Sequence, residues 1–128
     1  MENIVFYVLG ALILLLISRR FFLQMTIQQY TPVAAHERTV KTKDSILLDV
    51  RTSSERSAQH IKGSVHIPLQ ELTSKITSLE KYKDKEIICY CQSGSRSISA
   101  AAKLKKFGFT SANMKGGISA WNFSHLSK

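Results

Sequence analysis

The sequence predicts an α/β domain with a mostly parallel sheet flanked by helices, preceded by one N-terminal transmembrane helix. Two observations lead to this prediction. From Tyr30 on, short apolar runs of strand length alternate with segments that carry helix signals, an order typical of parallel sheets covered on both faces. Ahead of that alternation, Asn3 to Ser18 reads NIVFYVLGALILLLIS, 16 residues without a charge. With 128 residues, the chain has room for one modest core besides this apolar segment.

The apolar segment fits a thin membrane span. As a helix it would be about 24 Å long, somewhat short of a hydrocarbon core of about 30 Å, and Arg19 and Arg20 can reach the headgroups from its end. A cleaved signal peptide is the main alternative, and a peripheral or packed helix is another. A signal peptide carries its positive charge ahead of the apolar run, whereas here Glu2 precedes the run and the two arginines follow it. An uncleaved anchor is therefore the preferred interpretation.

This interpretation divides the chain into a transmembrane anchor, a linker with a first short strand, and the folded domain, at residues 1–23, 24–30 and 31–128. The positive-inside rule places everything after Arg20 in the cytoplasm, which predicts a single-pass protein of the cell membrane. The two cysteines agree with a reducing compartment. Cys89 and Cys91 lie one residue apart on one predicted strand, where they cannot form a stabilising disulfide.

The charge balance is strongly basic, with a formal net charge of +9 from 18 basic and 9 acidic residues. Such a charge suits nucleic acid, an anionic membrane surface or a small anionic substrate. The basic residues are scattered, without an arginine-rich arm or an aromatic-basic repeat, so we do not expect a nucleic-acid partner. Lys103, Lys105 and Lys106 fit a solvated helix face, and attraction to an anionic membrane surface is the alternative.

The first half of the domain carries a signal for each element. Thr31 and Pro32 predict a helix N-cap followed by proline at the first helical position, leading into VAAHERTV. SILLDV, residues 45–50, is an apolar run of strand length. Thr52 and Glu55 have the spacing of a capping box, which predicts a short helix. GSVHIP then predicts a second short strand that ends at its proline.

The second half continues the alternation. LQELTSKITSLEKY, residues 69–82, has apolar residues on one helical face, at positions 69, 72, 76 and 79. EIICYC predicts another buried strand, and SISAAAKLKKFG predicts a helix that ends with Gly108 at its C′ position. SANM predicts a weak last strand, and GGISAWNF predicts a turn into a terminal helix with Trp121 in the core.

The chemistry of the chain is expected where Cys91 ends a strand, because parallel sheets bind ligands beyond the carboxyl ends of their strands. Gly94 can take a positive φ, and Ser97 is positioned to cap the following helix. The backbone N–H groups of such a loop point inward at the sulfur, and the helix N-terminus and Arg96 favour a negative charge there. We therefore predict that the Cys91 thiol ionises more easily than a free cysteine, and that the same amides would hold a terminal sulfur.

Other residues near this loop have structural interpretations. Cys91 itself could be a buried structural cysteine. Cys89 is expected in the core, with a resolving thiol as the alternative. Asp49 and Arg51, at the end of a buried strand, are expected to form a charge-assisted structural bond near the site. His60 is expected to be a structural, hydrogen-bonded histidine near the site, because a thiolate already ionised by its loop needs no general base.

Four stretches resemble the rhodanese, or thiosulfate sulfurtransferase-like, family in its own order: LLDVR (47–51), HIKGSVHIP (60–68), CQSGSRS (91–97) and GGISAW (116–121). With their spacing they cover nearly all of residues 30–123, and the likeness is greatest to single-domain bacterial members with an N-terminal membrane anchor. The resemblance implies an α/β sandwich with a five-stranded sheet, and a catalytic cysteine that cycles through a persulfide. No metal or organic cofactor is expected, because the cysteine itself carries the sulfur.

The resemblance implies that Cys91 attacks the outer sulfur of a small anionic donor, such as thiosulfate or a persulfide, and passes the sulfur to a thiol or cyanide acceptor. Arg96 would orient the donor or support the loop. The expected substrate-binding residues form the loop itself: Gln92, Ser93, Gly94, Ser95, Arg96 and Ser97. The membrane is expected as a partner through residues 3–18, and a protein partner is left open.

Two other functions are compatible with the resemblance. The domain could be a persulfide carrier or a docking module with little turnover. It could also be a cysteine-based phosphatase or arsenate reductase, but the loop length argues against this. Cys91 to Arg96 spans six residues, as in sulfurtransferases, one fewer than in the related phosphatases and reductases, whose wider ring surrounds a tetrahedral oxyanion.

Overall fold

Five parallel strands form the centre of the domain, in the order β1-β5-β4-β2-β3. The computed structural model describes residues 1–124, without the side chains of Leu23, Gln24 and Phe123, so the last four residues of the predicted domain lie outside the described residues. The strands are β1 (Gln28–Tyr30), β2 (Ser45–Asp49), β3 (Val65–His66), β4 (Glu86–Tyr90) and β5 (Ser111–Met114). The predicted fold class, a parallel sheet flanked by helices, is confirmed.

The two central strands are continuous apolar runs because helices cover both of their faces. β2 and β4 pair in parallel with Leu48 opposite Cys89 and Asp49 opposite Tyr90. This register ends both strands at the same edge of the sheet. Cys91 follows β4 directly, so it emerges beside the end of β2.

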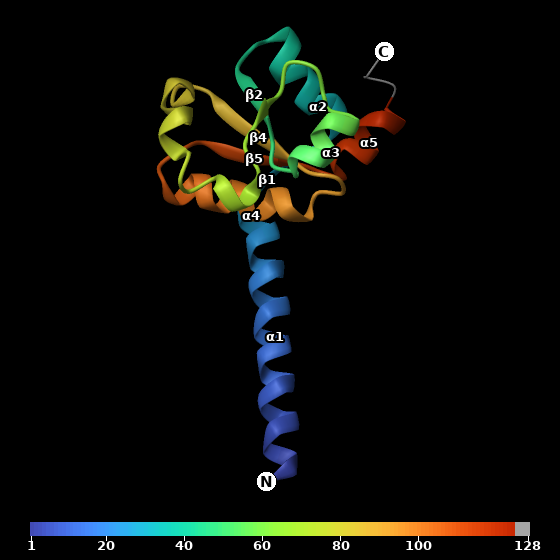
Figure 1. Cartoon of the computed structure of the whole chain (residues 1–128), viewed down its shortest axis with the longest axis vertical. Helices are drawn as coiled ribbons and strands as arrows, with labels where there is room; N and C mark the ends of the chain where they lie inside the picture. Colours follow the sequence, from blue (N-terminus) through green and yellow to red (C-terminus); the bar gives the residue numbers. More distant parts are fainter. Residues whose placement is uncertain (125–128) are drawn as a thin grey trace.

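The helical segments cover the two faces of the sheet, as Figure 1 shows. Their bounds are α2 (Pro32–His36), α3 (Ser53–Ala58), α4 (Ser95–Lys106), α5 (Gly117–Phe123), the π-helical turn η1 (Glu37–Lys41), and the 3₁₀ segments η2 (Leu69–Glu71) and η3 (Ile76–Tyr82). On one face, Leu72, Leu79 and Leu104 pack in one buried cluster with Cys89 and Cys91. The opposite face has a second cluster that includes Ala35, Leu47, Ile88, Met114 and Trp121.

The predicted starts of α2 and α3 are confirmed. The Thr31 hydroxyl accepts a hydrogen bond from the N–H of Ala34 at 3.2 Å, with Pro32 at the first helical position. Thr52 and Glu55 form both halves of a capping box at the start of α3. The segment after Thr31 is only partly α-helical, because it widens into η1 after His36.

The helix predicted over residues 69–82 is wrong in type. The segment forms the two 3₁₀ pieces η2 and η3, although Leu72 and Leu79 are fully buried as their spacing predicted. Serine hydroxyls explain the difference. Ser74 donates to the carbonyl of Glu71 at 2.9 Å, and Ser78 donates to that of Lys75 at 2.6 Å. Such local bonds compete with the α-helical pattern.

Ser97 was also predicted wrongly, as the cap of the helix after the loop. α4 begins at Ser95, and its N-cap is Gly94, with φ at +102°. The left-handed glycine turns the chain into the helix earlier than the sequence pattern indicated. Ser97 therefore lies inside the first turn, fully buried.

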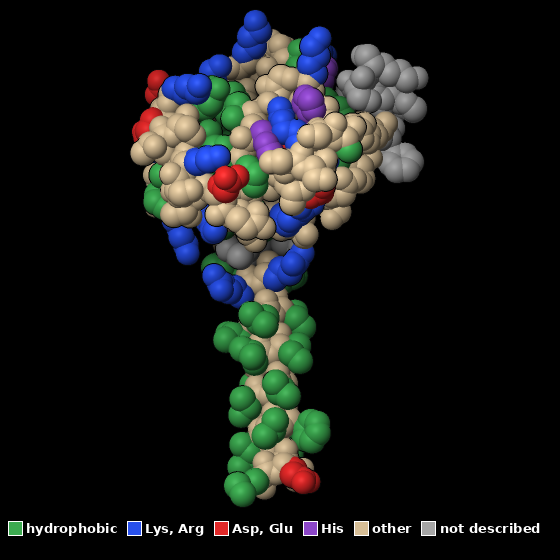
Figure 2. All heavy atoms as spheres, in the orientation of Figure 1, with side chains coloured by type: hydrophobic (Ala, Val, Ile, Leu, Met, Phe, Trp, Pro, Cys, Tyr) green, Lys and Arg blue, Asp and Glu red, His purple; other side chains and the backbone are tan. Residues whose placement is uncertain are grey.

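The N-terminal apolar segment is one continuous helix, α1 (Glu2–Thr26), which projects from the domain and contacts α4 (Figure 1). It continues beyond the predicted anchor boundary at residue 23, so residues 24–26 of the predicted linker are helical and only Ile27 separates α1 from β1. Among the described residues, its segment Glu2–Phe22 is the one helix long and apolar enough to cross a membrane. Figure 2 shows hydrophobic side chains along the exposed helix, and Lys and Arg where it meets the domain.

Candidate active site

Cys91 lies at the centre of the loop between β4 and α4. Its side chain is buried, with 1% of the residue exposed. The N–H of Gly94 donates to Sγ at 3.1 Å, and the hydroxyl of Ser97 donates to it at 3.3 Å. The positive φ of Gly94 is what turns its N–H toward the sulfur while α4 begins.

The loop lowers the pKa of the Cys91 thiol. Burial alone raises this pKa, because it disfavours the thiolate. The Ser97 hydroxyl and the Gly94 N–H donate to the sulfur, and together with the nearby N–H groups of Ser97 and Ser93 they outweigh burial. The net direction agrees with the ionisation predicted from the sequence. Burial raises the pKa of the neighbouring Cys89 thiol, which is fully buried in the core as expected.

Arg96 is held by a carboxylate that the sequence analysis assigned to capping alone. Its Nη1 and Nη2 donate to Oε1 and Oε2 of Glu55 at 2.7 and 2.8 Å, a bidentate pair. Arg96 lowers the pKa of Glu55 to about 2, and Glu55 raises that of Arg96, with a further contribution from Cys91. Because Glu55 also closes the capping box with Thr52, the pair joins the loop to the start of α3.

The charge-assisted bond expected between Asp49 and Arg51 is present. The Nε and Nη2 atoms of Arg51 donate to the two carboxylate oxygens of Asp49 at 3.1 and 3.0 Å, and both side chains are buried. The hydroxyl of Tyr90 donates to the same carboxylate at 3.0 Å. Burial raises the pKa of Asp49, but the Arg51 bonds outweigh it and hold the pKa below its usual value. Arg51 also donates to the side chain of Gln92 at 3.5 Å, which links this network to the loop.

The start of α5 packs directly on the loop, a contact that the sequence did not reveal. The N–H of Ile118 donates to the carbonyl of Cys91 at 2.9 Å, and that of Ser119 donates to Gln92 at 3.2 Å. Gly117 permits this approach. Its φ is +60°, and a Cβ added there would overlap the carbonyl oxygens of Cys91 and Gln92. The GG pair, interpreted from the sequence as a turn, thus also supports the backbone of Cys91.

Asn113 is a further site residue that the sequence did not reveal. It lies on β5 with 1% of its surface exposed, and its Oδ1 accepts a hydrogen bond from the Ser97 hydroxyl at 2.5 Å. The sequence showed SANM only as a weak strand. An asparagine in an otherwise small and apolar strand was the available signal, since a buried amide requires polar partners.

The remaining loop residues differ in exposure. Gln92 and Ser93 are exposed, whereas Ser95 and Arg96 are half-buried. A hollow of about 480 Å³ lies beside the loop, and Ser93, Gly94 and Ser95 line one side of it. Arg20, in the last two turns of α1, also lines this hollow. The loop therefore lies close to the junction of the domain with α1.

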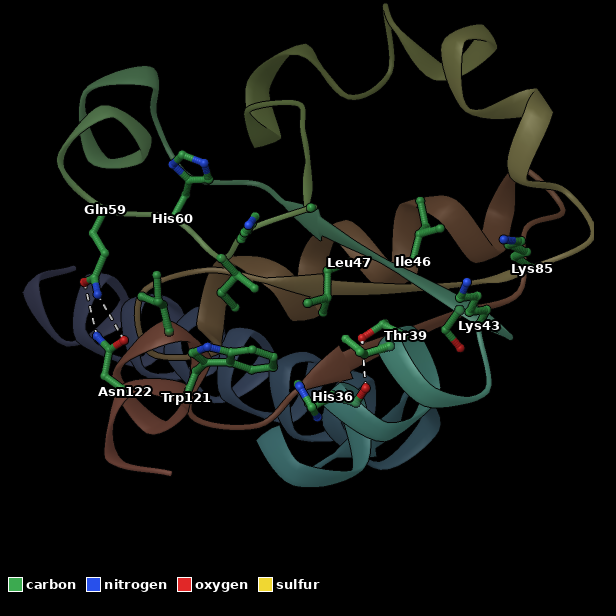
Figure 3. A pocket seen from close by; sticks show the side chains of 16 residues that line it. His36, Thr39, Lys43, Ile46, Leu47, Gln59, His60, Lys85, Trp121 and Asn122 are labelled. Carbon is green, nitrogen blue, oxygen red and sulfur yellow. Dashed lines mark hydrogen bonds between the residues drawn. The ribbon is translucent and has the colours of Figure 1, made fainter. Parts of the chain in front are cut away.

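A larger groove of about 790 Å³ lies on the face of the sheet that bears Trp121 (Figure 3). His60 lines this groove, and none of the loop residues 91–97 does. The imidazole is exposed, with Nδ1 3.2 Å from the carbonyl oxygen of Arg56. The structure thus puts His60 at the groove and not beside the loop around Cys91, where it was expected. Gln59 and Asn122 bond to each other through both amides at one end of the groove.

Comparison with known proteins identifies relatives of this arrangement. The family model of the rhodanese-like domain matches residues 32–124. The chain is 33% identical over 97 residues to the putative sulfurtransferase YtwF of Bacillus subtilis (strain 168), covering 76% of this chain and 92% of that protein. It is 38% identical over 89 residues to the putative sulfur carrier protein YrkF of the same strain, covering 68% and 47%. The solved structure of a rhodanese-related protein from Thermoplasma volcanium has a TM-score of 0.68 at 30% identity, covering 76% and 92%.

The contact of α5 with the loop can be tested by replacing Gly117 with alanine. We expect Gly117→Ala to lower the free energy of unfolding by about 3 kcal/mol, because the added Cβ displaces α5 as well as straining the backbone. Gly63→Ala is the matched control, since Gly63 also has a positive φ but open space around a Cβ. Gly63→Ala should lower the free energy of unfolding by only about 1 kcal/mol. Equal losses in urea denaturation would show that α5 does not depend on this close approach.

The Ser97 hydroxyl bond predicts a pH effect. Because this bond lowers the pKa of Cys91, Ser97→Ala should raise the pKa, reduce the thiolate fraction at neutral pH and slow alkylation by iodoacetamide roughly tenfold at pH 7. Ser99→Ala, at an exposed position of the same helix, should leave the rate unchanged. Identical rate profiles against pH for the two variants would exclude the role assigned to the hydroxyl.

Proposed function

Because the chain belongs to the rhodanese-like domain family, we propose that it is a membrane-anchored sulfurtransferase that carries sulfane sulfur as a persulfide on Cys91. The observation that carries this proposal is the set of hydrogen-bond donors around Sγ. They favour the thiolate, which is the nucleophilic form of cysteine. The same donors suit the terminal sulfur of a persulfide, because it is also negatively charged.

The proposed reaction has two displacement steps. In the first, the Cys91 thiolate attacks the outer sulfur of the donor, a new S–S bond forms, and the bond within the donor breaks. With thiosulfate, sulfite leaves with the bonding electron pair. In the second, an acceptor thiolate or cyanide attacks the terminal sulfur, and Cys91 leaves as the thiolate that the loop stabilises. The cysteine returns to its starting state, as ping-pong nucleophilic catalysis requires.

Arg96 favours sulfur transfer over phosphate or arsenate chemistry. Recognition of a tetrahedral oxyanion uses an arginine fork that is free to donate two bonds. Here one N–H of each terminal nitrogen of Arg96 already donates to Glu55, whose carboxylate compensates the charge of the guanidinium. Arg96 was expected either to orient the sulfur donor or to support the loop. Its ion pair with Glu55 favours the second role. The small ring of donors would then select a sulfur atom, and either thiosulfate or a persulfide can supply it.

Sulfur carriage with little turnover is the second candidate function. The similarity to the putative sulfur carrier protein YrkF supports it, although the chain spans about half of that relative. The loop geometry supports formation of the persulfide in both cases. What separates the two functions is the rate of the second displacement with a small acceptor.

The proposed anchoring rests on α1 and its surroundings. The helix exposes apolar side chains along its length, and no residue of its most apolar window is buried in the domain. Where α1 meets the domain, one hollow between α1 and α4 is lined by Arg19 and Arg20 of α1 and by Lys103 and Lys106 of α4. These cations suit an anionic headgroup layer, and their position supports a cytoplasmic domain by the positive-inside rule.

The sulfurtransferase proposal predicts formation of thiocyanate from thiosulfate and cyanide. We expect Cys91→Ser to abolish this activity, because serine is a poor nucleophile toward sulfane sulfur and forms no persulfide. Cys89→Ser is the matched control and should retain activity in the fraction that folds. Activity that survives in Cys91→Ser would overturn the proposed mechanism, and single-turnover formation of thiocyanate would favour the carrier.

The anchoring proposal predicts that the full chain stays in the membrane pellet after alkaline carbonate extraction, and that its intact mass includes residues 1–23. Deleting residues 1–23 should give a soluble, folded domain, because Ile27 is the first residue of the chain in the described core. Extraction of the full chain by carbonate, or a mature mass that lacks the apolar segment, would contradict anchoring. The second result would identify a signal peptide.

A further inference from the structure

A chain of polar side chains runs from the catalytic sulfur to the far edge of the sheet. Ser97 contacts Sγ of Cys91 at 3.3 Å, and its hydroxyl donates to Oδ1 of Asn113 at 2.5 Å. Nδ2 of Asn113 donates to Oε1 of Gln29 at 2.7 Å. The strands fix this order, because β5 lies between β4 and β1 and pairs Asn113 with both Cys89 and Gln29.

The burial of this chain increases toward the sulfur. Gln29 is half-buried and lines the hollow beside the loop, whereas Asn113 and Ser97 are 1% and 0% exposed. Water therefore has little access to the inner two residues. Every change in the hydrogen bonding of Ser97 must be compensated by Asn113, since a buried polar group without a partner is costly.

The Ser97 hydroxyl has one proton and two acceptors, Sγ of Cys91 and Oδ1 of Asn113. When the sulfur is a neutral thiol, the proton can remain on the short bond to Asn113. When the sulfur is negative, the proton turns toward it. Oγ of Ser97 and Oδ1 of Asn113 then face each other at 2.5 Å with no proton between them, unless the Asn113 amide also reorients.

An amide side chain resolves this conflict by turning over. Rotation by half a turn brings Nδ2 of Asn113 to the Ser97 oxygen and Oδ1 to Gln29, whose own amide can turn to donate its Nε2 proton. Every bond of the chain is then kept with its direction reversed. All donors point toward the sulfur, and hydrogen bonds aligned in this way strengthen one another.

We propose that Asn113, supported by Gln29, is a positioning residue of the active site whose amide turns over to let Ser97 donate to the sulfur when that sulfur is negatively charged. This inference deepens the proposed function, since the charged species would be the thiolate and the terminal sulfur of the persulfide. The reversal needs no covalent step and no co-reactant.

The experiment measures the rate of iodoacetamide alkylation against pH on the full chain in detergent micelles, with intact mass to count adducts. Gln29→Glu is the decisive variant. A carboxylate only accepts, so it holds Asn113 with Oδ1 toward Ser97 and keeps the Ser97 proton away from the sulfur. We expect the midpoint of the alkylation profile to rise by about one pH unit. Asn113→Asp should shift it in the same direction, because it removes the donating nitrogen itself.

Gln28→Glu is the matched control, because Gln28 is exposed on the same strand and adds the same charge outside the chain. Arg96 on α4 and Cys89 on β4 are the other described titratable groups that interact with Cys91, and all three variants retain them. A shift for Gln29→Glu but not for Gln28→Glu supports the proposal. Equal shifts of the midpoint in both glutamate variants, or no shift in either, overturn the proposal. This comparison does not depend on whether Asn113→Asp folds.

Alkylation requires no sulfur donor, so this result is independent of the proposed sulfurtransferase activity. If the alkylation midpoint rises in Gln29→Glu although the wild-type protein forms no thiocyanate, the role of Asn113 is supported and the proposed function is contradicted. If the midpoint does not rise although the wild-type protein forms thiocyanate, the proposed function is supported and the role of Asn113 is contradicted.

Discussion

A negative sulfur inside a protein must be surrounded by hydrogen-bond donors, and the rest of this structure depends on meeting that requirement at Cys91. Desolvation by itself would keep the thiol neutral. The loop supplies N–H groups because Gly94 takes a left-handed conformation and α4 starts at once, and the buried Ser97 hydroxyl adds a side-chain donor to them. In the proposed mechanism the Cys91 thiolate would therefore be stabilised before a sulfur donor binds, which is how oriented dipoles contribute most to catalysis.

Two networks hold the loop in that shape from opposite ends. Asp49, Arg51 and Tyr90 join the ends of β2 and β4, and Arg51 continues to Gln92. On the other side, Glu55 braces Arg96 against α3. The same arginine that could have bound an anionic substrate thus has its charge compensated within the protein.

The sequence was sufficient for the fold class because the alternation of apolar runs and caps is local, as at Thr31 and in the capping box of Thr52. It was also sufficient to predict hydrogen-bond donors around Cys91, since a glycine-containing loop between a buried strand and a helix directs backbone N–H groups inward. It failed where hydroxyls act on their own backbone, at Ser74 and Ser78, and where Gly94 starts α4 early. The Glu55, Gly117 and Asn113 contacts join segments distant in sequence, and a single sequence gives no register for them.

The most direct test is the intact mass of the full chain in detergent after reduction, incubation with thiosulfate and removal of the excess. A persulfide on Cys91 predicts a gain of about 32 Da, one sulfur atom, that disappears on addition of cyanide and is absent from Cys91→Ser. The same gain in Cys91→Ser, or an adduct located on Cys89, would contradict a mechanism in which the loop around Cys91 carries the sulfur.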